Sequence, residues 1–83
     1  MAPKVFVYAL STCGHCKRTK QFLKDNQVAF DSIDVDLQEG EKRTALIDEV
    51  KKYNPRCTFP TVLIGDQVIV GFQEETLKRE LGL

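Results

Sequence analysis

The sequence predicts an α/β fold in which three helices cover a four-stranded mixed β-sheet. Apolar runs of strand length alternate with amphipathic stretches of helix length along the 83 residues, in the order β-α-β-α-β-β-α. Two strands joined by a helix are expected to be parallel with a right-handed crossover. The last two apolar runs are only two residues apart, which indicates an antiparallel hairpin. At this length we expect one domain, residues 1–83.

In the first half of the chain we expect two strands and one helix. A buried strand is expected over residues 4–10, on the basis of the apolar run at 5–10. A helix is expected over residues 14–26, with Ser11 or Thr12 as its cap. The inner face of this helix is predicted to carry Cys16, Thr19, Phe22 and Leu23. The second strand is predicted from Val28-Ala29-Phe30, with Ile33 and Val35 continuing it.

The second half is expected to hold two helices around a hairpin. Residues 40–53 predict a helix that Asn54-Pro55 ends. Its apolar positions are Leu46, Ile47, Val50 and Tyr53. Strands are expected at 61–64 and 67–70, on either side of Gly65-Asp66. A last amphipathic helix is expected over 73–82, with Leu77 and Leu81 facing inward.

The composition argues against several classes of partner. The formal net charge is zero, so no strong field attracts nucleic acid or anionic lipid. The longest apolar runs are about six residues, far short of the ~20 that a membrane helix needs. The N-terminal residues lead directly into the first predicted strand, so we expect no secretory signal. Three cysteines in such a chain fit a reducing compartment, and we expect a cytoplasmic monomer that needs no cofactor.

The segment Cys13-Gly14-His15-Cys16 lies between the first strand and the first helix. A cysteine at a helix N-terminus is close to unsatisfied N–H groups and to the positive end of the helix dipole, which favour the thiolate. This spacing in a βα context is typical of a thioredoxin-like redox site. The alternatives are two structural thiols or half of a zinc site, which would need four ligands. We expect Cys13 to attack disulfides and Cys16 to resolve the mixed disulfide.

Two neighbours of this pair are candidates for tuning the thiolate. A protonated His15 would stabilise the Cys13 thiolate, and Lys17 would add positive charge; alternatively, both residues only face solvent. The third thiol, Cys57, is interpreted as a small packing residue or as a further redox-active group. Four aspartates, at positions 31, 34, 36 and 48, are too scattered to predict a metal site.

The chain resembles the glutaredoxin branch of the thioredoxin fold. The resemblance rests on the redox motif, on Thr58-Phe59-Pro60-Thr61 before the hairpin and on Val70-Gly71-Phe72 after it. It implies a cis peptide bond at Pro60 and a Phe59 backbone that pairs with an extended peptide or with glutathione. The substrate-binding residues implied are Thr12, Thr58, Phe59, Pro60, Gly71 and Phe72. Phe59 and Phe72 are either ordinary core or rim aromatics or an apolar docking patch beside Cys13.

Departures from the family pattern bear on the electron donor. Glutathione-dependent members usually carry Pro-Tyr between the cysteines and a basic residue where this chain has Leu10. They also have Gly-Gly and an aspartate region where this chain has Val70-Gly71-Phe72-Gln73. That segment is closer to the glutaredoxin-like hydrogen donors of ribonucleotide reductase. We therefore expect a thiol–disulfide oxidoreductase that acts on protein or small-molecule disulfides and is fed by a thioredoxin-reductase-type flavoprotein.

Two alternatives remain from the same resemblance. The first is a glutathione-dependent glutaredoxin, which would use the same cysteine pair. The second is an iron–sulfur or metal-binding module. Family members that hold a cluster usually carry Cys-Gly-Phe-Ser, so the second thiol, Cys16, argues against this alternative.

Overall fold

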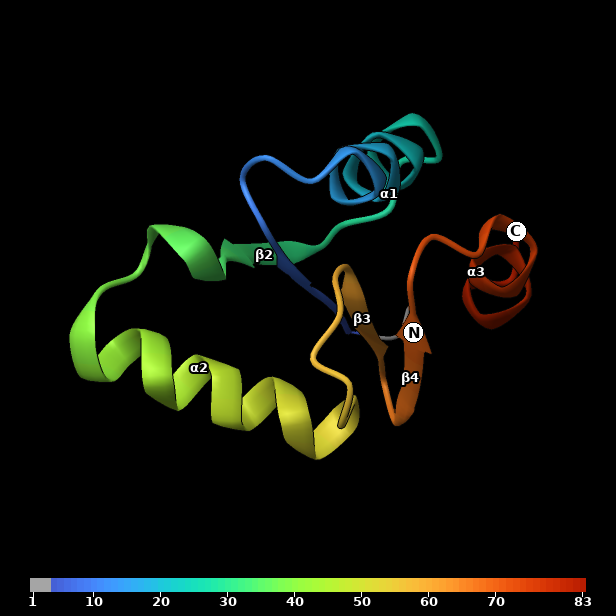
Figure 1. Cartoon of the computed structure of the whole chain (residues 1–83). Coiled ribbons are helices and arrows are strands. Elements are labelled where there is room, and N and C mark those ends of the chain that lie inside the picture. Colours follow the sequence, from blue (N-terminus) through green and yellow to red (C-terminus); the bar gives the residue numbers. More distant parts are fainter. Residues whose placement is uncertain (1–3) are drawn as a thin grey trace.

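The structure, a computed structural model, describes residues 4–83. Its sheet has the order β2-β1-β3-β4, with β1 parallel to β2 and antiparallel to β3, and with β3 and β4 forming an antiparallel hairpin (Figure 1). The predicted four-stranded mixed sheet with three helices is therefore confirmed. The elements are β1 (Val5–Ala9), α1 (Gly14–Asp25), β2 (Asp31–Asp34), a 3-10 turn η1 (Val35–Leu37), α2 (Gly40–Tyr53), β3 (Thr61–Ile64), β4 (Gln67–Val70) and α3 (Glu74–Leu81).

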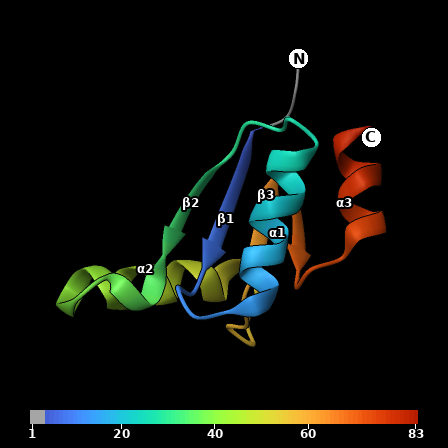
Figure 2. The same ribbon diagram turned by 90° about the horizontal axis from the view of Figure 1, so that it is seen from above.

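The helices lie in two layers on opposite faces of the sheet. Helices α1 and α3 cover one face, and α2 crosses the other (Figures 1 and 2). Because successive side chains of β1 point to opposite faces of the sheet, this strand contributes to the core on both faces. Val5, Val7 and Ala9 join the core beneath α1 and α3, whereas Tyr8 is buried on the side of α2. The central strand is therefore apolar on both faces, which explains its continuous apolar run.

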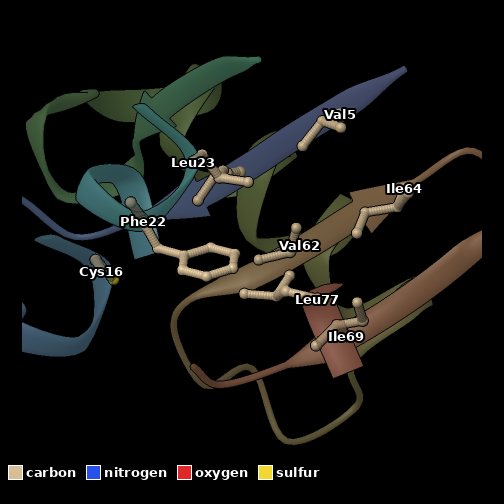
Figure 3. Packing of buried hydrophobic residues seen from close by; sticks show 10 residues of the cluster. Val5, Cys16, Phe22, Leu23, Val62, Ile64, Ile69 and Leu77 are labelled. Carbon is tan, nitrogen blue, oxygen red and sulfur yellow. The ribbon is translucent and has the colours of Figure 1, made fainter. Parts of the chain in front are cut away.

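The larger core cluster links the redox helix to the C-terminal half of the chain. Leu23 and Phe22 of α1 meet side chains of β3, β4 and α3, as Figure 3 shows. The predicted inner face of α1 is confirmed, and Cys16 belongs to this cluster with only 1% of its surface exposed. The residues of the cluster are Val5, Val7, Ala9, Cys16, Phe22, Leu23, Val62, Ile64, Ile69 and Leu77.

The second strand is shorter than predicted, because it includes Ile33 but neither Val28-Ala29-Phe30 before it nor Val35 after it. After α1 the chain turns through Gln27 with φ +57°, and the N–H of Val28 donates to the carbonyl of Leu23 at 2.9 Å. Val28 and Phe30 then pack against the cluster beneath α1 without pairing in the sheet. The strand itself is Asp31–Asp34. It lies at the edge of the sheet, so the strand tolerates polar residues on both sides of Ile33.

Other boundaries agree closely with the sequence pattern. Helix α2 begins and ends at the predicted residues, although Tyr53 is 43% exposed rather than turned inward. The hairpin turns at Gly65, whose φ of +56° lies in the left-handed region that glycine adopts at little cost. Leu77 of α3 is fully buried and Leu81 is partly buried. Within residues 4–83, no helix has the length and apolarity to cross a membrane.

Candidate active site

Cys13, and not the predicted Ser11 or Thr12, is the N-cap residue of α1, and a short turn separates it from the end of β1. Its backbone is extended, with φ −84° and ψ 120°, and its sulfur accepts a hydrogen bond from the N–H of Cys16 at 3.3 Å. A thiol therefore occupies the position where a serine or aspartate oxygen usually satisfies a free helix N–H. The N–H of Cys13 donates to the carbonyl of Leu10 at 3.2 Å, which closes a tight turn between strand and helix.

The two thiols have opposite electrostatic surroundings. Partial burial of Cys13 acts to raise the pKa of its thiol, but hydrogen bonds from the Cys16 thiol and from the N–H groups of Cys16 and His15 outweigh it, so the pKa lies below its ordinary value. Burial of Cys16, followed by its bond to Cys13, raises the pKa of that thiol to about 12. The exposed member of the pair is thus the better thiolate and the buried member stays protonated.

A loop that ends in a cis peptide bond lies opposite Cys13. The bond between Phe59 and Pro60 is cis, as the family resemblance implied, and Pro60 is buried. The thiol of Cys13 donates a long hydrogen bond, 3.9 Å, to the carbonyl of Phe59. The N–H of Gly71 donates to the carbonyl of Pro60 at 2.8 Å, with Gly71 at φ +81°. The structure therefore brings Cys13, Phe59, Pro60 and Gly71 together around one point.

Phe72 and Phe59 both lie at the rim of the core. Phe72 packs edge to face on Phe22 of α1, with ring centroids 6.0 Å apart, and is partly exposed. Phe59 is partly buried and contacts both core clusters. Each ring therefore has one side in the core and some surface in solvent, as an apolar docking patch requires.

The remaining candidates of the sequence analysis lie nearby, and most of them are exposed. Thr12 and Thr58 are exposed, and so are His15 and Lys17. Within residues 4–83, the side chains of His15 and Lys17 make no hydrogen bond or ion pair; His15 acts on Cys13 through its backbone N–H. Cys57 packs against the cluster on the α2 side, with φ +51°.

Asn54 is a residue of the site that the sequence analysis treated only as a helix stop. It is 3% exposed, and its side-chain amide donates to the carbonyl of Thr58 at 3.1 Å, to its hydroxyl at 2.9 Å and to the hydroxyl of Thr61 at 3.2 Å. The Thr61 hydroxyl in turn donates to the carbonyl of Thr58 at 2.8 Å. This network fixes the loop that presents the Phe59 carbonyl. The only sign of this network in the sequence is that two residues with hydroxyl groups, Thr58 and Thr61, follow Asn54 closely.

Two aspartates, one at the end of β2 and one in η1, hold the other side of the site. The carboxylate of Asp36 accepts from the N–H of Ser11 at 2.9 Å and from its hydroxyl at 2.6 Å, and these bonds lower the pKa of Asp36. The ammonium of Lys20 lies 3.1 Å from Asp34. Within residues 4–83 there is no group of three or more His, Cys, Asp or Glu side chains placed to hold a metal ion. Through their bonds to Ser11 and Lys20, Asp36 and Asp34 join the active-site turn and α1 to the end of β2.

A dithiol pair at the start of a helix, facing a cis-proline loop across the end of a mixed sheet, defines a thiol–disulfide oxidoreductase of the thioredoxin-fold class. The family model for glutaredoxin matches residues 5–69. The chain belongs to the glutaredoxin family.

Solved structures agree with this assignment over nearly the whole chain. The structure of methanoredoxin from Methanosarcina acetivorans is similar with a TM-score of 0.94 and 40% identity, covering 99% of this chain and 87% of that one. A glutaredoxin from Methanosarcina mazei Go1 gives a TM-score of 0.89 and 43% identity, covering 98% and 80%. Among relatives found by sequence, a glutaredoxin-like protein NrdH from Lactococcus lactis is 28% identical over 75 residues, which are 90% of this chain and 96% of that protein.

Proposed function

We propose that Cys13 is the nucleophile and Cys16 the resolving thiol of a dithiol exchange that reduces protein or small-molecule disulfides. The observation that carries this proposal is the contrast between the two sulfurs. Cys13 is partly exposed and its pKa is lowered, whereas Cys16 is buried and its pKa is raised. Because the thiolate is the nucleophile in exchange, the first attack on a substrate falls to Cys13.

In the first step, the Cys13 thiolate attacks one sulfur of the substrate disulfide. The other substrate sulfur leaves as a thiolate, and Cys13 is then joined to the substrate in a mixed disulfide. This bond removes the negative charge of Cys13, which was one of the influences that raised the pKa of Cys16. Cys16 then loses its proton to solvent and attacks Cys13, which releases the reduced substrate and leaves a Cys13–Cys16 disulfide.

Phe59, Pro60 and Phe72 are the proposed docking surface for the substrate. The Phe59 carbonyl lies beside the sulfur of Cys13 and is positioned to pair with an extended peptide. The partly exposed rings of Phe59 and Phe72 would contact apolar side chains next to the disulfide. Thr12, Thr58 and Gly71 complete this surface, His15 lies on the α1 side, and Lys17 adds positive charge there. We place this chemistry in the cytoplasm, in a protein that acts as a monomer.

A thioredoxin-reductase-type flavoprotein is the proposed electron donor. Leu10 packs against the cluster on the α2 side, at the position where a basic residue would hold a glutathione carboxylate. At the other end of the site, the first turn of α3 carries Glu74 and Glu75. Negative charge already occupies this helix N-terminus, so a further carboxylate is disfavoured there.

Trapping tests the division of labour between the thiols. Cys16→Ser should still attack a disulfide and then stop as a mixed disulfide on Cys13, which mass spectrometry identifies. Cys13→Ser should lose all exchange activity, and the matched control Cys57→Ser should keep it. An adduct on Cys57 in the Cys16→Ser protein would overturn the assignment of the nucleophile.

A coupled assay tests the donor. Insulin reduction is followed with NADPH and thioredoxin reductase in one arm and with glutathione, glutathione reductase and NADPH in the other. We expect clear turnover in the first arm and weak turnover in the second. Rapid, saturable turnover with glutathione would reject the proposed donor and leave the roles of Cys13 and Cys16 standing.

A further inference from the structure

Lys20 is held beside the resolving half of the redox pair by an ion pair between α1 and the end of β2. Its ammonium lies 3.1 Å from a carboxylate oxygen of Asp34, and the two side chains are only 25% and 28% exposed. Lys20 follows Cys16 by one helical turn, and residues four apart lie on the same face of a helix, about 5–6 Å apart at Cβ. Asp34 therefore keeps this positive charge close to the core instead of letting it extend into water.

The charged and titratable groups around Cys16 are few. Cys13 lies at the N-cap, Lys20 lies one turn along α1, and Asp34 lies behind Lys20 at the end of β2. The cluster that buries Cys16 from β1, β3, β4 and α3 consists of apolar side chains. Lys20 is the one cation of this group, and the negative charge of Cys13 is absent once Cys13 is part of a mixed disulfide.

We propose that Lys20 is a positioning residue for the second half of the exchange, because its ammonium, fixed by Asp34, stabilises the Cys16 thiolate while that thiolate attacks Cys13. The inference rests on the proposed role of Cys16 as the resolving thiol. Burial raises the pKa of Cys16, whereas a hydrogen bond from the backbone of Leu10 and, to a smaller extent, the positive charge of Lys20 lower it.

The step in which Lys20 acts is balanced without a further reactant. Cys16 loses its proton to solvent, and its sulfur forms a bond to the sulfur of Cys13. The bond between Cys13 and the substrate sulfur breaks, and the substrate leaves as a thiolate with the electron pair. Lys20 neither gains nor loses a proton in this step. It also does not touch the substrate, so the first attack by Cys13 does not depend on it.

The size of the effect follows from two opposing consequences of removing the charge. Without Lys20 a smaller fraction of Cys16 is thiolate, but a more basic thiolate is more nucleophilic, with a Brønsted coefficient of about 0.4–0.5. For each roughly tenfold loss of thiolate, the attack therefore slows by only about threefold. The ion pair is still about a quarter exposed and a partly solvated pair of this kind adds little to stability, so variants at Lys20 should fold.

The test separates the two halves of the exchange in single-turnover kinetics. Reduced protein in a Cys57→Ser background is mixed with one equivalent of dithiobis(nitrobenzoate), and release of thionitrobenzoate is followed by absorbance. The first release reports attack by Cys13, and the second reports attack by Cys16 on the mixed disulfide. For Lys20→Gln we expect an unchanged first release and a second release slowed about threefold.

The pH dependence distinguishes a charge effect from a structural one. The rate of the second release rises with pH, and the Lys20→Gln profile should be displaced by about half a pH unit to higher pH. Lys20→Arg should restore the original profile. The matched control Lys24→Gln, which removes an exposed charge from the last turn of the same helix, should leave both releases unchanged.

Two results would overturn the inference. One is a second release in Lys20→Gln that equals the parent protein at every pH. The other is an Arg variant as slow as the Gln variant, which would assign the effect to packing. Absence of any second release in the parent protein would instead reject Cys16 as the resolving thiol, so the failure of the proposed function is recognised separately.

Discussion

Replacement of Asn54 by alanine should destabilise the protein far more than its place at the end of a helix indicates. The side-chain amide donates to three acceptors in the loop before Pro60, at 2.9–3.2 Å. Asn54→Ala removes these bonds from a site that is 3% exposed, where water does not readily replace them. The carbonyl of Thr58 still accepts from the hydroxyl of Thr61 at 2.8 Å, so no buried carbonyl is left without a partner.

The expected loss of stability follows from the number of hydrogen bonds that the Asn54 amide makes. A typical intramolecular hydrogen bond contributes about 0.5–1.5 kcal/mol net, and one amide group with two hydrogens shares the three acceptors. The expected loss is about 2 kcal/mol of the free energy of unfolding, including the small cavity that the missing amide leaves. For a domain of this size, 1 kcal/mol corresponds to about 4–8 °C, so the melting temperature should fall by about 8–16 °C.

Guanidinium unfolding followed by circular dichroism measures the loss in free energy, and a thermal scan measures the melting temperature. The matched control is Asn26→Ala, which removes one amide bond of 2.8 Å, to the carbonyl of Phe22, at the exposed end of α1. This control should cost no more than about 0.5 kcal/mol, because water replaces an exposed partner. Equal losses in the free energy of unfolding of the two variants would refute the reasoning that burial makes the Asn54 hydrogen bonds more stabilising than the exposed one of Asn26.

Two further predictions concern the ionisable groups of the site. His15→Ala should raise the pKa of the Cys13 thiol and move its iodoacetamide rate–pH profile to higher pH; an unmoved profile would assign thiolate stabilisation to the hydrogen bonds alone. The hydrogen bonds from Ser11 lower the pKa of Asp36 in the folded state. These bonds therefore contribute stability above the unfolded-state pKa of about 3.9, and the contribution is lost as pH falls through the lowered folded-state value. Asp36→Asn should therefore be less stable than the parent at neutral pH and approach it in acid, as denaturant titrations across that range would detect; a pH-independent difference would contradict this.

The parts of the fold that sequence could predict are those with strong local signals. Helix α2 ends at the predicted residue because Asn54-Pro55 stops it, and the hairpin forms around Gly65-Asp66 as expected. Cys13 and Cys16 were identified because their spacing and their place after a strand are both local properties. The cis bond at Pro60 came from the family resemblance, since the residues around it do not specify the isomer.

The parts that sequence could not predict depend on long-range contacts. The second strand is Asp-Ser-Ile-Asp, whose polarity is acceptable only because the strand lies at the sheet edge. Asp34 and Asp36 were seen as scattered acids, because nothing local shows that β2 places them beside α1 and the active-site turn. Asn54 was seen as a helix stop, since its partners Thr58 and Thr61 become acceptors only when the loop folds back on it.

The pairing of β1 with both β2 and β3 makes thiol reactivity a reporter of folding. Cys13 and the Phe59 carbonyl are 46 residues apart in the chain and meet only when β1 and β3 are aligned. Cys16 is shielded by the same C-terminal half, through Val62 and Leu77. A sub-global opening that detaches β3, β4 and α3 would therefore expose Cys16 to alkylation while the first βαβ unit stays formed. The rate of Cys16 alkylation in the native state, compared with the rate of global unfolding, would measure how cooperatively the two halves of the chain are joined.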